Sequence, residues 1–187
     1  MKTDKIKNSN SIAKGILITS ILLLLVMALL NAKGVYVQIA TPPNGISHKT
    51  LSTLLIIAMV ISLVYLLKDK VTRGIVIGIG AFFILINRLP ELLTGVEYTT
   101  FSSPDNEHKF VVIEKGIGQL YQLSDSGLFM TYLADIHTDD GYKPFSNGAY
   151  KLIWISDDRL IIHYAFDYMD ENNYDNYRKI SVQYKRD

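Results

Sequence analysis

Residues 15–30 read GILITSILLLLVMALL, an apolar run broken only by Thr19 and Ser20. A helix rises about 1.5 Å per residue, so this run and its flanks approach the roughly 30 Å hydrocarbon layer of a bilayer. Four lysines precede the run, which is also typical of a cleaved signal peptide. The apolar core is longer than the usual signal core, and Leu30 stands where a small residue should precede a cleavage site after Ala32. We therefore expect an uncleaved membrane anchor over about residues 15–31.

Two further apolar segments follow in the first half of the chain. Residues 51–67 contain nothing more polar than serine, threonine and tyrosine, and after a six-residue loop residues 74–86 are apolar again. We expect the third span to cover about residues 71–93, because Arg88 can reach the interface with its long side chain and leucines continue past Pro90. The alternative for this segment is a re-entrant or interfacial helix. The sequence thus predicts a three-helix membrane anchor over residues 1–95.

Basic residues are distributed unevenly among the segments that join these spans. The N-terminal tail carries four lysines and the loop 68–73 carries three basic residues, whereas the segment 31–50 holds only Lys33 and Lys49. Lysine and arginine accumulate in cytoplasmic loops, so this distribution places the tail and the 68–73 loop in the cytoplasm. With three spans, the segment 31–50 and the C-terminal part of the chain are then expected outside it.

The third span contains a GxxxG motif formed by Gly74 and Gly78, with Gly80 nearby. Small residues at this spacing allow two helices to approach closely. We expect these glycines to pack against the first two spans of the same chain. The alternative is a contact between two copies of the chain.

The C-terminal half differs in composition from the anchor. Residues 97–187 carry 15 acidic and 9 basic side chains, which argues against a nucleic-acid partner, because phosphate binding needs clustered lysine and arginine. The chain has no cysteine, which excludes disulfides, thiolate metal sites and a cysteine nucleophile. A cysteine-free exported domain also fits a Gram-positive bacterium.

From residue 96 onward, short β-rich segments alternate with turn signals, which is typical of a small antiparallel sheet or sandwich. The clearest unit is a hairpin whose two alternating strands, 151–155 and 159–166, meet at Asp157 and Asp158. We predict one mostly-β domain over residues 96–187, with Phe110, Phe129 and Trp154 in its core. The segments expected to form strands are 98–101, 109–115, 119–123, 128–133, 151–155, 159–166 and 179–184.

Three stretches of this domain carry a resemblance. They are SPD at 103–105, HKFVVIE at 108–114 and, above all, TDDGYKPFSNG at 138–148. Together they resemble a family of small Bacillus-type membrane proteins with a C-terminal extracytoplasmic β domain and no assigned function. The resemblance covers roughly residues 101–166. It implies a cell-membrane location and carries over no site residues.

The strongest chemical candidate is the segment from Asp135 to Gly141. Alternate residues of an extended segment point the same way, so Asp135, His137 and Asp139 could converge on a metal ion. The spacing departs from a calcium loop, since Asp140 follows Asp139 where a glycine is needed, and zinc would need further ligands. The alternative is a solvated polar loop. No catalytic set and no cofactor motif is recognisable.

Two classes of function remain open. The first is a non-enzymatic, multi-pass membrane protein that presents an extracytoplasmic binding or interaction domain. Its partners would be the lipid bilayer and another envelope or membrane protein. The alternative is an extracytoplasmic metal-dependent enzyme whose site is not recognisable. The absence of a coherent catalytic set favours the first.

Overall fold

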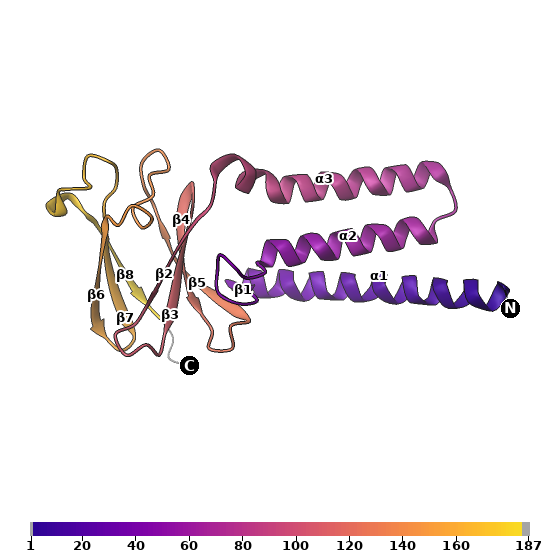
Figure 1. Ribbon diagram of the computed structural model, residues 1–187, viewed down its shortest axis with the longest axis horizontal. Helices are drawn as coiled ribbons and strands as arrows, with labels where there is room; N and C mark the ends of the chain where they lie inside the picture. Colours follow the sequence, from indigo (N-terminus) through magenta and orange to yellow (C-terminus); the bar gives the residue numbers. More distant parts are fainter. Residues whose placement is uncertain (1, 185–187) are drawn as a thin grey trace. The chain divides into compact units, whose positions relative to one another are not determined.

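The computed structural model describes residues 2–184, which form two compact units (Figure 1). The first unit consists of the chain up to Lys33 together with Ser47–Pro90, and the second of Gly34–Ile46 together with the chain from Glu91 onward. The sequence placed residues 34–46 in the anchor, as a loop between two spans. They belong instead to the β unit, because their backbone forms part of its sheet.

The helical unit contains α1 (Lys2–Ala32), α2 (His48–Leu66) and α3 (Lys70–Thr94). Each helix contains a stretch that is long and apolar enough to cross a membrane, namely Ser9–Ala32, His48–Leu66 and Lys70–Leu89. Ser47 caps α2, because its hydroxyl accepts the Thr50 N–H at 3.2 Å. Asp69 does the same at the start of α3, where its carboxylate accepts the Thr72 N–H at 2.7 Å.

The helices meet through specific contacts. The hydroxyl groups of Ser9 in α1 and Tyr65 in α2 are hydrogen-bonded at 2.6 Å. Arg88 in α3 donates to the Thr50 hydroxyl at 3.0 Å and to the Thr53 hydroxyl at 3.2 Å, both in the first turns of α2. These bonds satisfy a guanidinium group that would otherwise be costly near the apolar layer.

The glycines of α3 do not all pack as expected. A Cβ added at Gly80 would overlap the Val60 side chain, so this glycine allows α3 to approach α2 closely. A Cβ at Gly74 or Gly78 would meet no other atom within 4 Å. The prediction that the GxxxG pair itself packs against the first two helices is therefore wrong. The neighbouring Gly80 makes that contact, because it lies on a different side of the helix.

The β unit contains a five-stranded antiparallel sheet with the strand order β1-β5-β4-β3-β2. Its edge strand β1, which the sequence analysis did not predict, pairs Val35 with Thr131 and Val37 with Phe129. A second, three-stranded antiparallel sheet has the order β6-β7-β8. The strands are β1 (Val35–Val37), β2 (Glu97–Ser102), β3 (Lys109–Lys115), β4 (Ile117–Leu123), β5 (Phe129–Ile136), β6 (Tyr150–Ser156), β7 (Arg159–Tyr164) and β8 (Arg178–Gln183).

Each of the seven segments predicted as strands overlaps an observed strand, and the predicted hairpin is β6–β7. The two sheets share a core to which β3, β4 and β5 contribute from one side and β7 and β8 from the other. Phe110 and Ile162 are fully buried in it, and Trp154 packs against it. Phe129 is 37% exposed, so its prediction as a core residue is wrong; it lies at the start of β5, opposite the short edge strand.

A second cluster lies on the other face of the larger sheet. In β3, Phe110 and Val112 belong to the shared core while Val111 and Ile113 belong to this second cluster, so both faces of the strand are covered. Tyr36 of β1 packs against the second cluster, with its ring edge-on to that of Tyr121 at a centroid distance of 5.4 Å. The segment between two apolar helices thus supplies part of the packing of the β unit.

Candidate functional site

The structure divides the segment from Asp135 to Gly141 between the end of a strand and a turn. Asp135 lies in β5, where its carboxylate accepts a hydrogen bond from the Gln119 amide at 3.4 Å. The strand ends at Ile136, so the two-residue alternation that would align His137 and Asp139 with Asp135 does not continue. Among residues 2–184, no three histidine or acidic side chains gather to hold a metal ion.

The backbone of this segment forms a turn instead. The Asp139 N–H donates to the Phe166 carbonyl at 2.9 Å, and the Asp139 carbonyl accepts the Tyr142 N–H at 2.7 Å. Asp140 and Gly141 have φ values of 44° and 70°, which reverse the chain. The polar loop that stood as the alternative is the arrangement observed.

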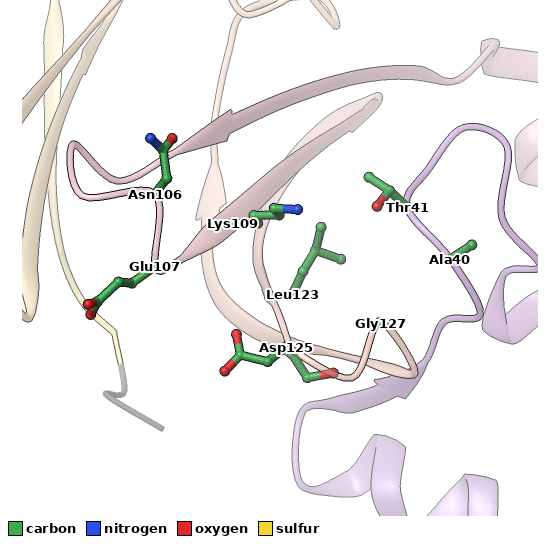
Figure 2. A pocket seen from close by; sticks show the side chains of 9 residues that line it. Ala40, Thr41, Asn106, Glu107, Lys109, Leu123, Asp125 and Gly127 are labelled. Atoms are coloured by element: carbon green, nitrogen blue, oxygen red, sulfur yellow. The ribbon is translucent and has the colours of Figure 1, made fainter.

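A polar cleft in the β unit offers a better candidate site. Three turns form its walls, namely the loop after β1, the β2–β3 turn and the β4–β5 turn (Figure 2). Its volume is about 280 Å³. We call it the three-turn cleft. The lining residues are Ala40, Thr41, Asn106, Glu107, Lys109, Leu123, Ser124, Asp125 and Gly127.

The β2–β3 turn is held by its own polar groups. The Ser103 hydroxyl donates to the Asp105 carboxylate and accepts the His108 N–H at 3.0 Å, and Asp105 also accepts the Glu107 N–H at 3.1 Å. These donors lower the pKa of Asp105, the Ser103 hydroxyl most of all. Ser103 is buried, so the Ser-Pro-Asp stretch serves to shape this wall of the cleft.

The loop after β1 is equally constrained. It is closed by two backbone bonds between Ile39 and Ile46, at 3.0 and 2.8 Å, and the buried Gln38 amide donates to the Ala40 carbonyl at 2.9 Å. A Cβ at Gly45 would overlap the carbonyl oxygens of Ile39 and Ala40, so only glycine fits there. The Ala40 N–H donates to the Gly127 carbonyl at 3.0 Å, which ties this loop to the β4–β5 turn.

The charges of the cleft are divided between its sides. Lys109 directs its amino group toward the loop that carries Thr41, and the carboxylates of Glu107 and Asp125 point away from that loop (Figure 2). All three side chains are exposed, so they keep most of their hydration. Such an open, polar surface suits a partner that also carries both charges and polar backbone groups. It lacks the enclosure that binding of an apolar ligand requires.

Part of this site was accessible from the sequence. In a run of hairpins, alternate turns fall at the same end of the sheet, so the turns at 103–106 and 125–127 could have been placed together. The third wall could not, because Ala40 and Thr41 lie some sixty residues before the nearest of the other walls.

Comparison with protein-family models, with curated proteins and with solved structures found no match for this chain. The resemblance to the Bacillus-type family therefore stays a prediction.

Proposed function

We propose that this chain is a multi-pass membrane protein that presents its β unit outside the cytoplasm as a non-enzymatic binding module. The three-turn cleft is its contact site. The N-terminus and the 68–73 loop then lie in the cytoplasm, as the distribution of lysine and arginine favours.

The pairing of β1 with β5 carries this proposal. β1 belongs to the segment between α1 and α2, and β5 follows α3, so these two parts of the chain must lie on the same side of any membrane that the helices cross. Three spans also put these parts on one side, which agrees with the charge distribution. A topology in which α1 and α2 cross the membrane and α3 does not would separate them and leave the edge of β5 unpaired.

The construction of the cleft supports a role in binding. Its walls are turns held by internal hydrogen bonds, so a partner would meet a largely preformed surface and lose little free energy in ordering it. An extended peptide segment of another envelope protein fits such a surface, because it carries polar backbone groups along its whole length.

The location can be tested by labelling single cysteines, because the chain has none of its own. Ser126→Cys places a thiol on the exposed β4–β5 turn, and Asp69→Cys places the matched control in the loop between α2 and α3. A membrane-impermeant maleimide added to intact cells should label the first and spare the second until the cells are broken. Labelling of Asp69→Cys alone in intact cells would reverse the proposed orientation.

The cleft can be tested with a photo-crosslinking residue in place of Thr41. We expect discrete adducts to a partner that disappear when Lys109 is changed to Glu, because the cleft then loses its only lining cation. The same crosslinker in place of Asn172, on the exposed β7–β8 loop, is the control and should give a different pattern. Adducts that persist unchanged in Lys109→Glu would place the contact elsewhere.

A further inference from the structure

The outer face of the smaller sheet carries a row of basic side chains. Lys151 of β6 lies directly opposite His163 of β7, and His163 lies directly opposite Lys179 of β8 (strands labelled in Figure 1). Residues directly opposite one another share a face of the sheet, with Cβ atoms about 4.5–5.5 Å apart. Two lysines and a histidine therefore stand side by side across three strands, in a half of the chain whose net charge is negative.

This row concentrates basic groups on one face of the sheet. Lys151 and Lys179 stand on either side of His163. Within residues 2–184, no hydrogen bond or ion pair engages the ammonium group of Lys151, the imidazole of His163 or the ammonium group of Lys179. An anion placed between them could accept hydrogen bonds from all three side chains.

A pocket of about 400 Å³ opens over the same face. Lys151 and His163 contribute to it, together with Ile153 and three tyrosines, Tyr150, Tyr174 and Tyr177. We call it the tyrosine pocket. It shares no lining residue with the three-turn cleft, so its occupation is independent of the proposed function.

The tyrosine rings are held in place by their neighbours. Tyr150 stacks on Phe145 with a centroid distance of 4.6 Å and an interplanar angle of 22°. Tyr177 donates its hydroxyl to the Glu171 carbonyl at 2.9 Å, and its ring packs against that of Tyr174 at 4.9 Å. Tyr174 is nevertheless 69% exposed, so a large aromatic surface faces solvent beside the basic row.

The combination specifies the chemistry of a ligand. Aromatic faces bind flat, weakly polar surfaces such as the C–H face of a sugar ring. Lysine and histidine bind a phosphate or carboxylate. Asp175 and Asn176 follow Tyr174 in the short helix η1 (Tyr174–Asn176) and are exposed, so they can accept hydrogen bonds from hydroxyl groups. The volume lies near the lower end of the range for ligand pockets, which suits one ring and its substituents.

We propose that the tyrosine pocket binds an anionic saccharide, a sugar ring bearing a phosphate or carboxylate. The anion lies at the Lys151–His163–Lys179 row, and the ring lies against Tyr174.

The test uses the full chain in detergent micelles. Glucose 1-phosphate, glucuronate, glucose, inorganic phosphate and adenosine monophosphate are titrated separately, and saturation-transfer NMR reports which ligand protons contact the protein. We expect the two anionic sugars to bind at least tenfold more tightly than glucose or inorganic phosphate. Saturation should reach their C–H protons from the tyrosine rings.

Three variants separate the parts of the site. Lys151→Ala with Lys179→Ala should weaken binding of glucose 1-phosphate at least tenfold, and Tyr174→Ala should abolish saturation of the sugar C–H protons. Arg159→Ala is the matched control, because it removes a cation from β7 outside the pocket, and it should change neither.

Three results would overturn the proposal. Equal binding of inorganic phosphate would show an anion site without sugar recognition. Equal or tighter binding of adenosine monophosphate would show a nucleotide site. Affinities unchanged in the double lysine variant would place the ligand elsewhere.

Discussion

Glu114 shows how a single buried residue holds two distant parts of the β unit together. It is 3% exposed at the end of β3, and its carboxylate oxygens accept the N–H groups of Phe145 at 3.0 Å and Ser146 at 2.8 Å. This contact fixes the Lys-Pro-Phe-Ser-Asn-Gly stretch at residues 143–148, which turns at Gly148 with a φ of 75°. The motif that carried the family resemblance is thus a structural turn anchored by Glu114.

We predict that Glu114→Ala destabilises the β unit by about 1–3 kcal/mol, because it leaves the N–H of the buried Phe145, and that of Ser146 beside it, without acceptors. Chemical unfolding of the full chain in detergent, followed through the near-UV signal of Trp154, measures the change. Glu107→Ala is the control, since Glu107 is exposed and its loss should alter stability by less than about 0.5 kcal/mol. If Glu114→Ala and Glu107→Ala were equally stable, Glu114 would not anchor this turn.

A second prediction concerns pH. Burial raises the pKa of the Glu114 carboxyl above its ordinary value of 4.5, although the N–H groups of Phe145 and Ser146 oppose the shift. The native state therefore binds this proton more tightly than the unfolded chain. The contribution of Glu114 to the free energy of unfolding falls as pH rises from 4.5 through the raised pKa, and is fully retained below 4.5.

Glu114→Gln removes this titration while keeping the size of the side chain. The difference in unfolding free energy, wild type minus variant, should therefore decline as pH is raised through that window and be flat above it. The pKa values of Asp105 and Asp158 are lowered by hydrogen bonds from Ser103 and Ser156 respectively. Both residues are present in the two proteins, so their contributions cancel in the difference in unfolding free energy. If the difference in unfolding free energy rose with pH instead, the pKa of Glu114 would be lowered in the native state and not raised.

At the scale of elements, β1 is the strand that determines how the β unit is built. The Tyr132 N–H donates to the Gly34 carbonyl at 2.8 Å and the Gln38 N–H to the Leu128 carbonyl at 2.9 Å. Hydrogen-bonded pairs alternate with non-hydrogen-bonded pairs in an antiparallel ladder, so Val35 and Thr131 form a non-hydrogen-bonded pair. The side chains of such pairs lie closest together.

We therefore predict that Val35→Cys with Thr131→Cys forms a disulfide under mild oxidation, since the Cβ atoms of such a pair lie within reach of a disulfide. Loss of free thiols in the full chain, measured by maleimide labelling after denaturation, reports the bond. Val35→Cys with Phe129→Cys is the matched control, because it shifts the register by two residues. Faster oxidation of the control would refute the observed pairing.

The strands differ in how well the sequence predicts them, because some pair with a neighbour in sequence and others pair with a distant segment. β6 and β7 can be recognised in the sequence, because their alternating side chains stand on either side of the Asp157–Asp158 turn and the two strands pair with each other. β1 has only three residues, and it pairs with a strand more than ninety residues later. Alternation also failed beyond Ile136, where the end of β5 separates Asp135 from His137 and Asp139.

At the scale of the whole molecule, the chain passes between its two units three times, after Lys33, after Ile46 and after Pro90. Neither unit is a continuous segment, so no single cut separates them. Residues 34–46 cover the edge of β5 and bring Tyr36 against Tyr121. A β unit that starts at Glu91 therefore lacks an edge strand and part of its second apolar cluster.

The last prediction compares two fragments without helices. One is residues 91–187, and the other joins residues 34–46 to the same fragment through a flexible glycine–serine linker. The joined fragment should melt higher by at least about 5 °C, since each kcal/mol of stability is worth roughly 4–8 °C in a domain of this size. The shorter fragment exposes the β5 edge from Phe129 to Thr131 and should self-associate.

Gly45→Ala in the joined fragment is the decisive control. The added methyl group overlaps the carbonyl oxygens of Ile39 and Ala40, so the loop after β1 cannot close and its bond to Gly127 is lost. The variant should melt near the shorter fragment even though it keeps every residue of β1. If the two fragments melted at the same temperature, residues 34–46 would add nothing to the stability of the β unit. The β1–β5 pairing would then no longer support placing residues 34–46 and the C-terminal part of the chain on one side of the membrane.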